Sequence, residues 1–229
     1  MTAAIRENAT DRSNTGATQL PRVLSPTGAP MDLLAHLKVH GDTPYRGGPR
    51  MLIHTIESAG LTGRGGAAFP THRKLTAVAD QKGIPVVVGN GAEGEPASDK
   101  DKLLLWSSPH LVLDGLQLAA EAVGARRVHL YVHRHPELLQ RLRSALAERA
   151  TAGLDRIAVG LVAAPPRFLA GEETALASRV EGGSALPRFA PPRIFERGVD
   201  GAPTLVQNVE TLAQIALISR YGPAWFRAI

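Results

Sequence analysis

The sequence GRGGAAFPT, residues 63–71, places three glycines beside an arginine. Glycine has no side chain to block a ligand, so a loop of this kind can bring backbone amides close to an anion. Its spacing matches the dinucleotide-binding fingerprint, but that fingerprint should follow a strand and open a helix. This loop instead follows residues 51–59, whose apolar positions recur at helical spacing and end at Gly60. We therefore predict an anion-binding loop that differs from the standard Rossmann phosphate loop.

Two later segments have the same character. NGAEGEP, residues 90–96, follows a short apolar run, and GEET, residues 171–174, follows another. A single glycine cluster is most often a surface turn. Three glycine-bearing loops with polar side chains favour another interpretation, in which they surround one shared pocket.

Strands and helices alternate along the rest of the chain. Short apolar runs predict strands at 85–88, 128–132 and 157–162. Helical spacing, bounded by prolines and glycines, predicts helices at 31–39, 109–123, 136–152, 172–180 and 209–219, with a loop at 182–203. This order predicts an α/β fold, a Rossmann-like parallel sheet with helices on both faces and ligands at the carboxyl ends of the strands.

The composition argues against several classes of protein. With 229 residues, of which 44% are hydrophobic, the chain can bury a core. Its formal charge of +5 suits an anionic ligand, whereas 4% aromatic residues argue against nucleic acid as a partner. The chain has no cysteine and therefore cannot ligate a conventional iron-sulfur cluster. No apolar run approaches the ~20 residues of a membrane helix, so we expect no direct membrane insertion.

Three regions are expected along the chain. Residues 1–30 lack the apolar run of a secretory signal and are predicted to be a disordered leader. Residues 31–44 are predicted as a short helix and linker, and residues 45–229 as the main α/β domain. The expected location is cytoplasmic.

Taken together, the ordered motifs resemble the flavin-bearing 51 kDa subunit of respiratory complex I NADH dehydrogenase and the related diaphorase subunits, over residues from about 45 to 226. The resemblance rests on residues 63–71 with Lys74, 90–96 with Lys100 and Asp101, 109–111, 171–174, 203–204 and 208–211. It implies the FMN-binding domain fold of that subunit. We expect this chain to lack the ubiquitin-like and iron-sulfur cluster domains that come after it in the family.

The resemblance also implies a function. We expect a flavoprotein oxidoreductase that takes hydride from NADH onto FMN. Its electrons would pass to an iron-sulfur partner, either ferredoxin-like or with a thioredoxin fold, because this chain holds no cluster itself. Such partners would make it peripheral to the inner face of the cell membrane.

Site residues follow from the same resemblance. Those implied for FMN are Gly63, Arg64, Gly65, Gly66, Lys74, Asn90, Glu93, Gly171, Glu172, Glu173 and Asn208, and those implied for NADH are Phe69, Glu95 and Glu173. No catalytic residue is assigned besides the flavin, and no metal ligand, because the alternating His129 and His133 are more typical of packing or surface positions.

Each role has a structural alternative. Glu172 could favour the start of its own helix and Asn208 could cap the last one, Lys74 could be a solvated charge, and Phe69 could belong to the core. The chain also departs from the family pattern at Ala92 and Gln207, and at residues 188–193, which read RFAPPR. These departures favour a second interpretation, a degenerate FMN-binding or assembly subunit without NADH turnover.

Overall fold

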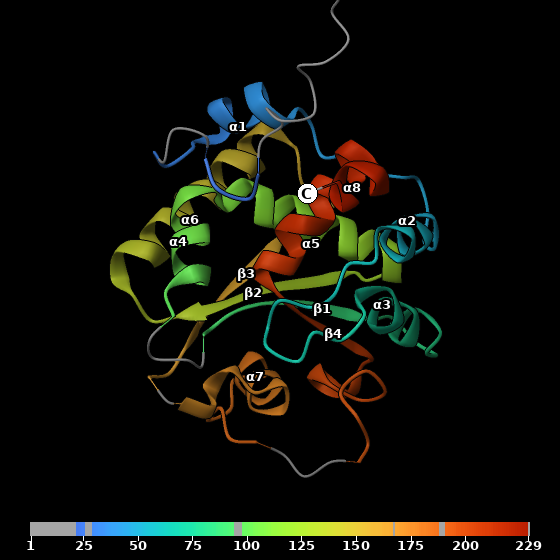
Figure 1. Cartoon of the computed structure of the whole chain (residues 1–229). Helices are drawn as coiled ribbons and strands as arrows, with labels where there is room; N and C mark the ends of the chain where they lie inside the picture. Colours follow the sequence, from blue (N-terminus) through green and yellow to red (C-terminus); the bar gives the residue numbers. More distant parts are fainter. Residues whose placement is uncertain (1–21, 26–28, 94–97, 167, 188–190, 229) are drawn as a thin grey trace, which may run out of the picture.

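Four parallel strands form one sheet in the order β3-β2-β1-β4 (Figure 1). This computed structural model describes residues 22–25, 29–93, 98–166, 168–187 and 191–228. The strands are β1 (Val86–Gly91), β2 (Arg127–His133), β3 (Val159–Ala164) and β4 (Thr204–Asn208). The first three confirm the predicted strands within two or three residues at their ends. The sequence analysis did not assign β4.

The sheet reverses its direction of growth at β1. The chain adds β2 beside β1 and β3 beside β2, and then returns to lay β4 along the other side of β1. Loops that leave two neighbouring strands toward opposite sides open a crevice at their carboxyl ends. The pairing register places Asn90 beside Asn208 at this point, so the fold itself creates a binding edge there.

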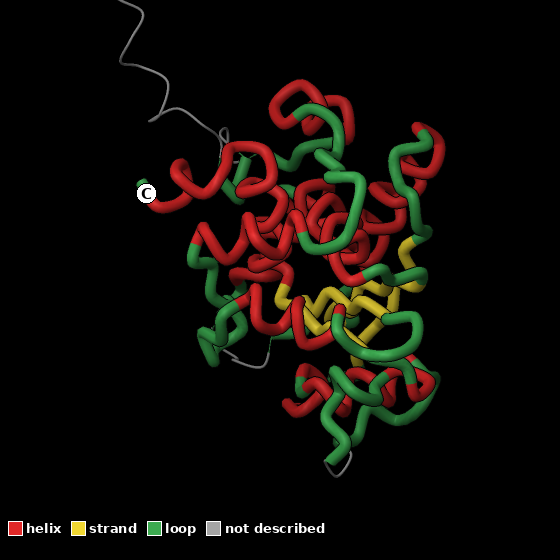
Figure 2. Tube along the Cα trace, turned by 90° about the vertical axis from the view of Figure 1, so that its right-hand side faces the viewer, coloured by secondary structure: helices red, strands yellow, loops and turns green. Residues whose placement is uncertain are grey.

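Helices cover both faces of the sheet, as predicted (Figures 1 and 2). One face carries α5 (Pro109–Val123) and α8 (Val209–Arg227), around which lie α1 (Leu33–His40), α2 (Met51–Ala59), α3 (Thr71–Ala79), α4 (Lys100–Ser107) and α6 (Pro136–Ala152). The other face carries α7 (Glu173–Val180) and the short 3-10 turns η1 (Phe168–Gly171) and η2 (Val199–Gly201). Within the described ranges, no helix is long and apolar enough to cross a bilayer.

Proline and glycine account for the helices that were predicted most accurately. Both α5 and α6 begin with a proline, and both end at a glycine in the left-handed conformation, Gly124 and Gly153. The helices α3 and α4 were not assigned from the sequence. In α4, KDKLLLWS, the apolar residues follow one another and do not recur at helical spacing.

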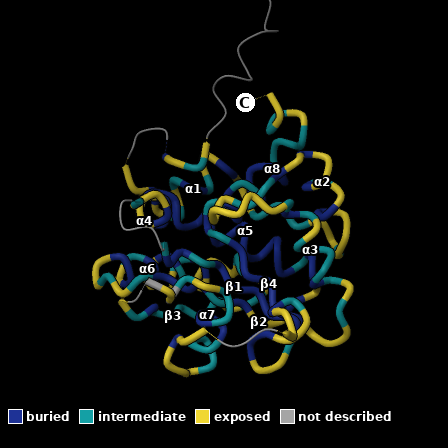
Figure 3. Tube along the Cα trace, turned by 60° about the horizontal axis from the view of Figure 1, so that its bottom comes forward, coloured by how far each residue is buried: buried dark blue, intermediate teal, exposed yellow. Residues whose placement is uncertain are grey.

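The helices α5 and α8 approach each other closely in the core (Figure 3). A Cβ atom added at Gly115 of α5 would lie 2.0 Å from the carbonyl oxygen of Leu212 in α8. Only glycine lets the two backbones come this close. Because Leu212 lies one turn after the end of β4, this contact also determines where the start of α8 sits above the sheet.

We predict that Gly115→Ala destabilises the fold by about 1–3 kcal/mol, since overpacking at a backbone contact outweighs the better helix propensity of alanine. Gly48→Ala is the matched control, because a Cβ there meets nothing within 4 Å. Urea unfolding of the two variants measures the difference. An unchanged midpoint for Gly115→Ala would contradict the close contact.

A buried carboxylate, Asp114 of α5, joins four parts of the chain. It is 1% exposed and accepts hydrogen bonds from His36 in α1 (2.9 Å), Thr43 (2.7 Å) and Arg149 in α6 (2.8 Å), and it also pairs with Arg220 in α8. Burial alone would raise the pKa of Asp114. The hydrogen bond from His36 and the charges of Arg149 and Arg220 outweigh burial and hold that pKa below its usual range.

Two further imidazoles lie beside this cluster. The ring centroid of His36 is 5.0 Å from that of His40 and 5.6 Å from that of His110. Burial, and then the charge of His36, lowers the pKa of His40 to about 4 and that of His110 to about 3. Both rings are therefore neutral in the folded protein at neutral pH.

This arrangement makes stability depend on pH. In the unfolded chain both rings regain a pKa near 6.5, so below that pH the unfolded state binds protons that the folded state cannot. The free energy of unfolding should fall from about pH 6.5 toward pH 4, by up to about 1.4 kcal/mol per pH unit for each ring. Thermal melts across this range measure the slope, and His40→Asn should make it shallower. Equal slopes for this variant and the wild type would contradict the assignment.

Candidate functional site

The three glycine-bearing loops meet at one pocket of about 480 Å³, where β1 and β4 end. This confirms the expectation that they share a site. The described residues that line the pocket are Arg64, Gly65, Gly66, Asn90, Ala92, Glu93, Lys100, Asp101, Leu169, Gly171, Glu172 and Asn208.

Asn90, near the end of β1, connects two of the loops. Its Nδ2 donates to the carbonyl oxygen of Gly171 (3.0 Å), and its Oδ1 accepts from the backbone amide of Ala92 (3.1 Å). The loops are in close contact, since a Cβ added at Gly171 would lie 2.5 Å from the carbonyl oxygen of Ala92. Glycine at position 171 is therefore required for this wall of the pocket.

Asn208, at the end of β4, caps the last helix, as the structural alternative predicted, and also lines the pocket. Its Oδ1 caps α8 by accepting from the amides of Glu210 (2.9 Å) and Thr211 (3.4 Å). Its Nδ2 donates to Oδ2 of Asp101 at 2.6 Å, and the residue lines the pocket. The cap determines the orientation of the amide and leaves its nitrogen toward the pocket side.

The loop at residues 63–71 uses part of its backbone to hold itself in place. The amide of Gly63 donates to the carbonyl oxygen of Phe69 (2.9 Å), and the amide of Arg64 donates to Oγ1 of Thr211 (2.9 Å). The role expected for the amide of Gly63 in ligand binding is therefore not supported, because that amide closes its own loop. Gly65 and Gly66 are the glycines of this loop that lie at the pocket wall.

Positive charge at the pocket comes from Arg64 and Lys100. The ammonium of Lys100 binds Oδ1 of Asp101 (2.6 Å) and Oε2 of Glu210 (3.1 Å), and Arg64 lies 3.9 Å from the same glutamate. Burial would lower the pKa of Lys100, but the two carboxylates outweigh it and raise that pKa. Burial raises the pKa of Asp101 despite its pairing with Lys100.

Other residues named from the sequence lie outside this described lining. Lys74 of α3 forms an ion pair with Glu173 of α7, so each charge is neutralised by the other. Phe69 is 52% exposed and is not a core residue. Glu95 lies outside the described residues.

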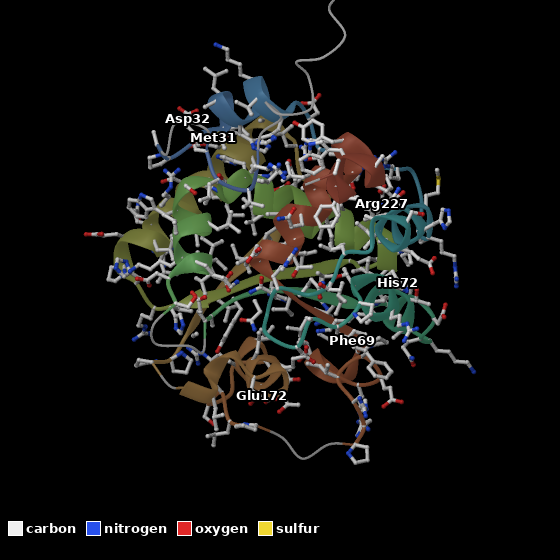
Figure 4. All side chains as sticks on the ribbon, in the orientation of Figure 1. Met31, Asp32, Phe69, His72, Glu172 and Arg227 are labelled. Carbon is white, nitrogen blue, oxygen red and sulfur yellow. The ribbon has the colours of Figure 1, made fainter. Side chains whose placement is uncertain are left out.

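Glu172 lines the pocket on the α7 side of the sheet, opposite Asp32 at the α1 end of the molecule (Figure 4). Its carboxylate accepts from the amides of Thr174 (3.0 Å) and Ala175 (2.9 Å) and caps α7. Glu172 therefore stabilises the start of its own helix, as the structural alternative predicted, and it also lines the pocket.

The site assignments from the sequence left out Ala92, Lys100, Asp101 and Leu169, which also line the pocket. Lys100 and Asp101 were among the residues that carried the resemblance, but they were given no role. Lys100 and Asp101 stand at the start of α4, a helix that the apolar spacing did not reveal. The signal that could have found them is their pair of adjacent charges directly after a glycine-bearing loop that follows a strand.

Comparison with known proteins assigns the chain to a family. A family model described as the Nuo51 FMN-binding domain matches residues 56–217. The chain belongs to this family. Its fold is the α/β FMN-binding domain of the complex I 51 kDa type, and FMN is the cofactor that family membership indicates.

Two subunits of NADH-quinone oxidoreductases are similar to this chain over most of its length. An NADH-quinone oxidoreductase subunit of Rhizobium meliloti is 34% identical, with 79% of this chain and 46% of that protein covered. The corresponding subunit of the Rhodobacter capsulatus enzyme is 36% identical, with coverage of 78% and 44%. The chain thus spans a little under half the length of these relatives.

A solved structure has the same fold. A chain in the crystal structure of an NAD⁺-reducing nickel-iron hydrogenase in the air-oxidized state superimposes with a TM-score of 0.78 at 33% identity. The match covers 88% of this chain and 36% of the hydrogenase chain.

The residues of the pocket fit FMN. Its volume of about 480 Å³ lies within the range of about 300–1,000 Å³ typical of ligand pockets. Gly65, Gly66 and Gly171 keep side chains out of the cradle. Arg64 and Lys100, which share their charges with Asp101 and Glu210, carry N–H groups that can donate to a phosphate. Asn90 and Asn208 have their amide oxygens bound to backbone amides, so they can offer N–H groups to the acceptor atoms of a flavin.

We predict that Gly171→Ala weakens FMN binding about tenfold, equivalent to ~1.4 kcal/mol, because the added methyl group separates the two loops. Titration of the protein into FMN, followed by the loss of flavin fluorescence, measures the dissociation constant. Gly48→Ala serves as the control with an open environment. Equal affinities for the two variants would contradict the close contact with Ala92.

Proposed function

We propose that this chain holds the FMN of an NADH-oxidising flavoprotein that passes electrons to an iron-sulfur partner. The observation that carries the proposal is the convergence of three distant loops on one donor-lined pocket at the reversal point of the sheet. The names of the relatives support it, since they are subunits of NADH-quinone oxidoreductases. The similar hydrogenase is likewise described as reducing NAD⁺.

Two sets of residues would hold the cofactor. Gly65 and Gly66 would form the cradle, and Arg64 and Lys100 would donate N–H groups to its phosphate. When bound, FMN supplies acceptance of a hydride and release of electrons one at a time. Asn90 and Asn208 would orient the flavin through their amide N–H groups, and fixed donors of this kind stabilise negative charge that develops on a bound ring.

The NADH part of the proposal rests on residues outside the described pocket lining. The exposed ring of Phe69 is free to stack on a base or a nicotinamide. The ion pair between Lys74 and Glu173 removes the like-charge repulsion that an unpaired Glu173 would exert on a dinucleotide. Glu95 remains a proposed NADH contact from the resemblance.

A second candidate function is favoured by two observations, one in the pocket wall and one beside Asn208 in β4. Ala92 is 6% exposed and supplies no polar side chain where the family pattern has aspartate. Gln207 is buried, and its Nε2 lies 3.4 Å from Oγ1 of Thr71 in α3. Both features reduce the polar groups offered to a ligand. They suit an FMN-binding or assembly subunit without NADH turnover.

Two additions to the purified chain separate these functions. FMN should bind and give a yellow protein, and NADH added without oxygen should bleach the flavin band if the chain is an NADH oxidant. Flavin that is retained without bleaching would favour the second candidate. A protein that never binds flavin would contradict the first candidate and leave only the assembly role of the second. Recovery of the flavin band after addition of an oxidised ferredoxin-like protein would support electron transfer to an iron-sulfur partner.

The pocket itself is tested by Gly65→Val. A Cβ at Gly65 already lies 3.4 Å from Cβ of Asn208, so the larger side chain would occupy the cradle. We expect FMN affinity to fall at least about tenfold. Gly48→Val is the matched control, and its affinity should equal that of the wild type, because a Cβ there meets nothing within 4 Å. Equal binding by Gly65→Val would place FMN elsewhere.

A further inference from the structure

The wall between α4 and α8 contains a charged group that the proposed function does not use. Asp101 is 3% exposed although it lines the pocket. Its two carboxylate oxygens have separate partners, with Oδ2 accepting from Nδ2 of Asn208 and Oδ1 accepting from Nζ of Lys100, each at 2.6 Å. Asp101 thus contacts two of the groups proposed to hold the cofactor.

The hydrogen bond from Asn208 to Asp101 restricts the nitrogen end of the Asn208 amide, and the helix cap restricts its oxygen end. Oδ1 of Asn208 accepts from the amides at the start of α8, and an ionised carboxylate at Asp101 can only accept. The nitrogen of Asn208 must therefore face Asp101. Of its two N–H groups one is bound to the carboxylate, and the other is left for the pocket.

The contact of Asp101 with Lys100 likewise leaves one N–H group for the pocket. Its ammonium has three N–H groups, and two are directed at Asp101 and Glu210. The third is left for a ligand in the pocket. Asp101 therefore holds one neutral donor and one cationic donor in the same wall.

We propose that Asp101 is a positioning residue for the flavin pocket, which orients Asn208 and Lys100 so that this wall presents N–H groups to a ligand rich in acceptor oxygens. This inference rests on the proposed role of the pocket. Asp101 acts through its two neighbours. A carboxylate that merely added negative charge would repel the phosphate of FMN, so the two roles predict opposite effects of its removal.

Dissociation constants for FMN test the proposal. Asp101→Ala should bind FMN about tenfold more weakly than the wild type, as the loss of charge-assisted hydrogen bonds would produce. Asp101→Asn should recover part of the affinity, because its amide oxygen can still accept from Asn208. Affinity equal to or tighter than that of the wild type in Asp101→Ala would overturn the proposal.

The matched control is Asp99→Ala. Asp99 stands two residues earlier, its side chain is 86% exposed, and it makes no side-chain capping hydrogen bond to α4. Its replacement removes the same charge close to the pocket without a contact to Asn208. We expect its FMN affinity to stay within about twofold of the wild type. A loss equal to that of Asp101→Ala would overturn the proposal.

A double-mutant cycle tests the route through Asn208. Asn208→Ser keeps an oxygen that can cap α8 and removes the amide donor. It should weaken FMN binding in the wild-type background and change it by less than about twofold in the Asp101→Ala background. Fold-changes that multiply would show two independent residues and overturn the positioning role.

The orientation can also be observed without cofactor. In ¹⁵N-labelled protein the side-chain amide signal of Asn208 should shift and exchange faster in Asp101→Ala, while Asp99→Ala leaves it unchanged. An unchanged signal in Asp101→Ala would overturn the positioning role. A wild-type chain that keeps the Asn208 signal but does not bind FMN would instead overturn the proposed function, so the two failures are distinguishable.

Discussion

The parallel pairing of β1 with β4 is the constraint on which the site depends. These strands are far apart in the sequence, yet their register sets Asn90 beside Asn208. Each asparagine then orders the segment after it, since Asn90 connects the loop after β1 to Gly171 and Asn208 starts α8. A slip of β4 by one residue in this pairing would turn Asn208 to the other face of the sheet, away from Asn90.

The sequence was sufficient for elements with strong local signals. The prolines and glycines that bound α5 and α6 act within a few residues, so their helices could be predicted to the residue. Nothing comparable marks β4. Its sequence, TLVQN, is short and mixed, and it becomes a strand because β1 offers it a partner. Tertiary pairing of this kind is invisible to local propensity.

The candidate site also has features that the sequence could predict and features that only the fold decides. Glycine-bearing loops reveal where a backbone can approach a ligand, so their convergence could be expected from the sequence. Which polar side chains remain available is decided by partners far along the chain. Lys74 is neutralised 99 residues away by Glu173, and Gln207 points to Thr71, 136 residues earlier. A role assigned to a single charged residue therefore needs the fold.

The buried carboxylate of Asp114 has a consequence for the smallest fragment that could be produced. The family match begins at residue 56, but His36 and Thr43, which hydrogen-bond to Asp114, lie upstream of it. A fragment cut at that boundary would keep the anion with Arg149 and Arg220 and lose these two hydrogen bonds. Water would then reach a charge that the intact chain encloses. The segment matched by the family model is therefore shorter than the segment that encloses Asp114.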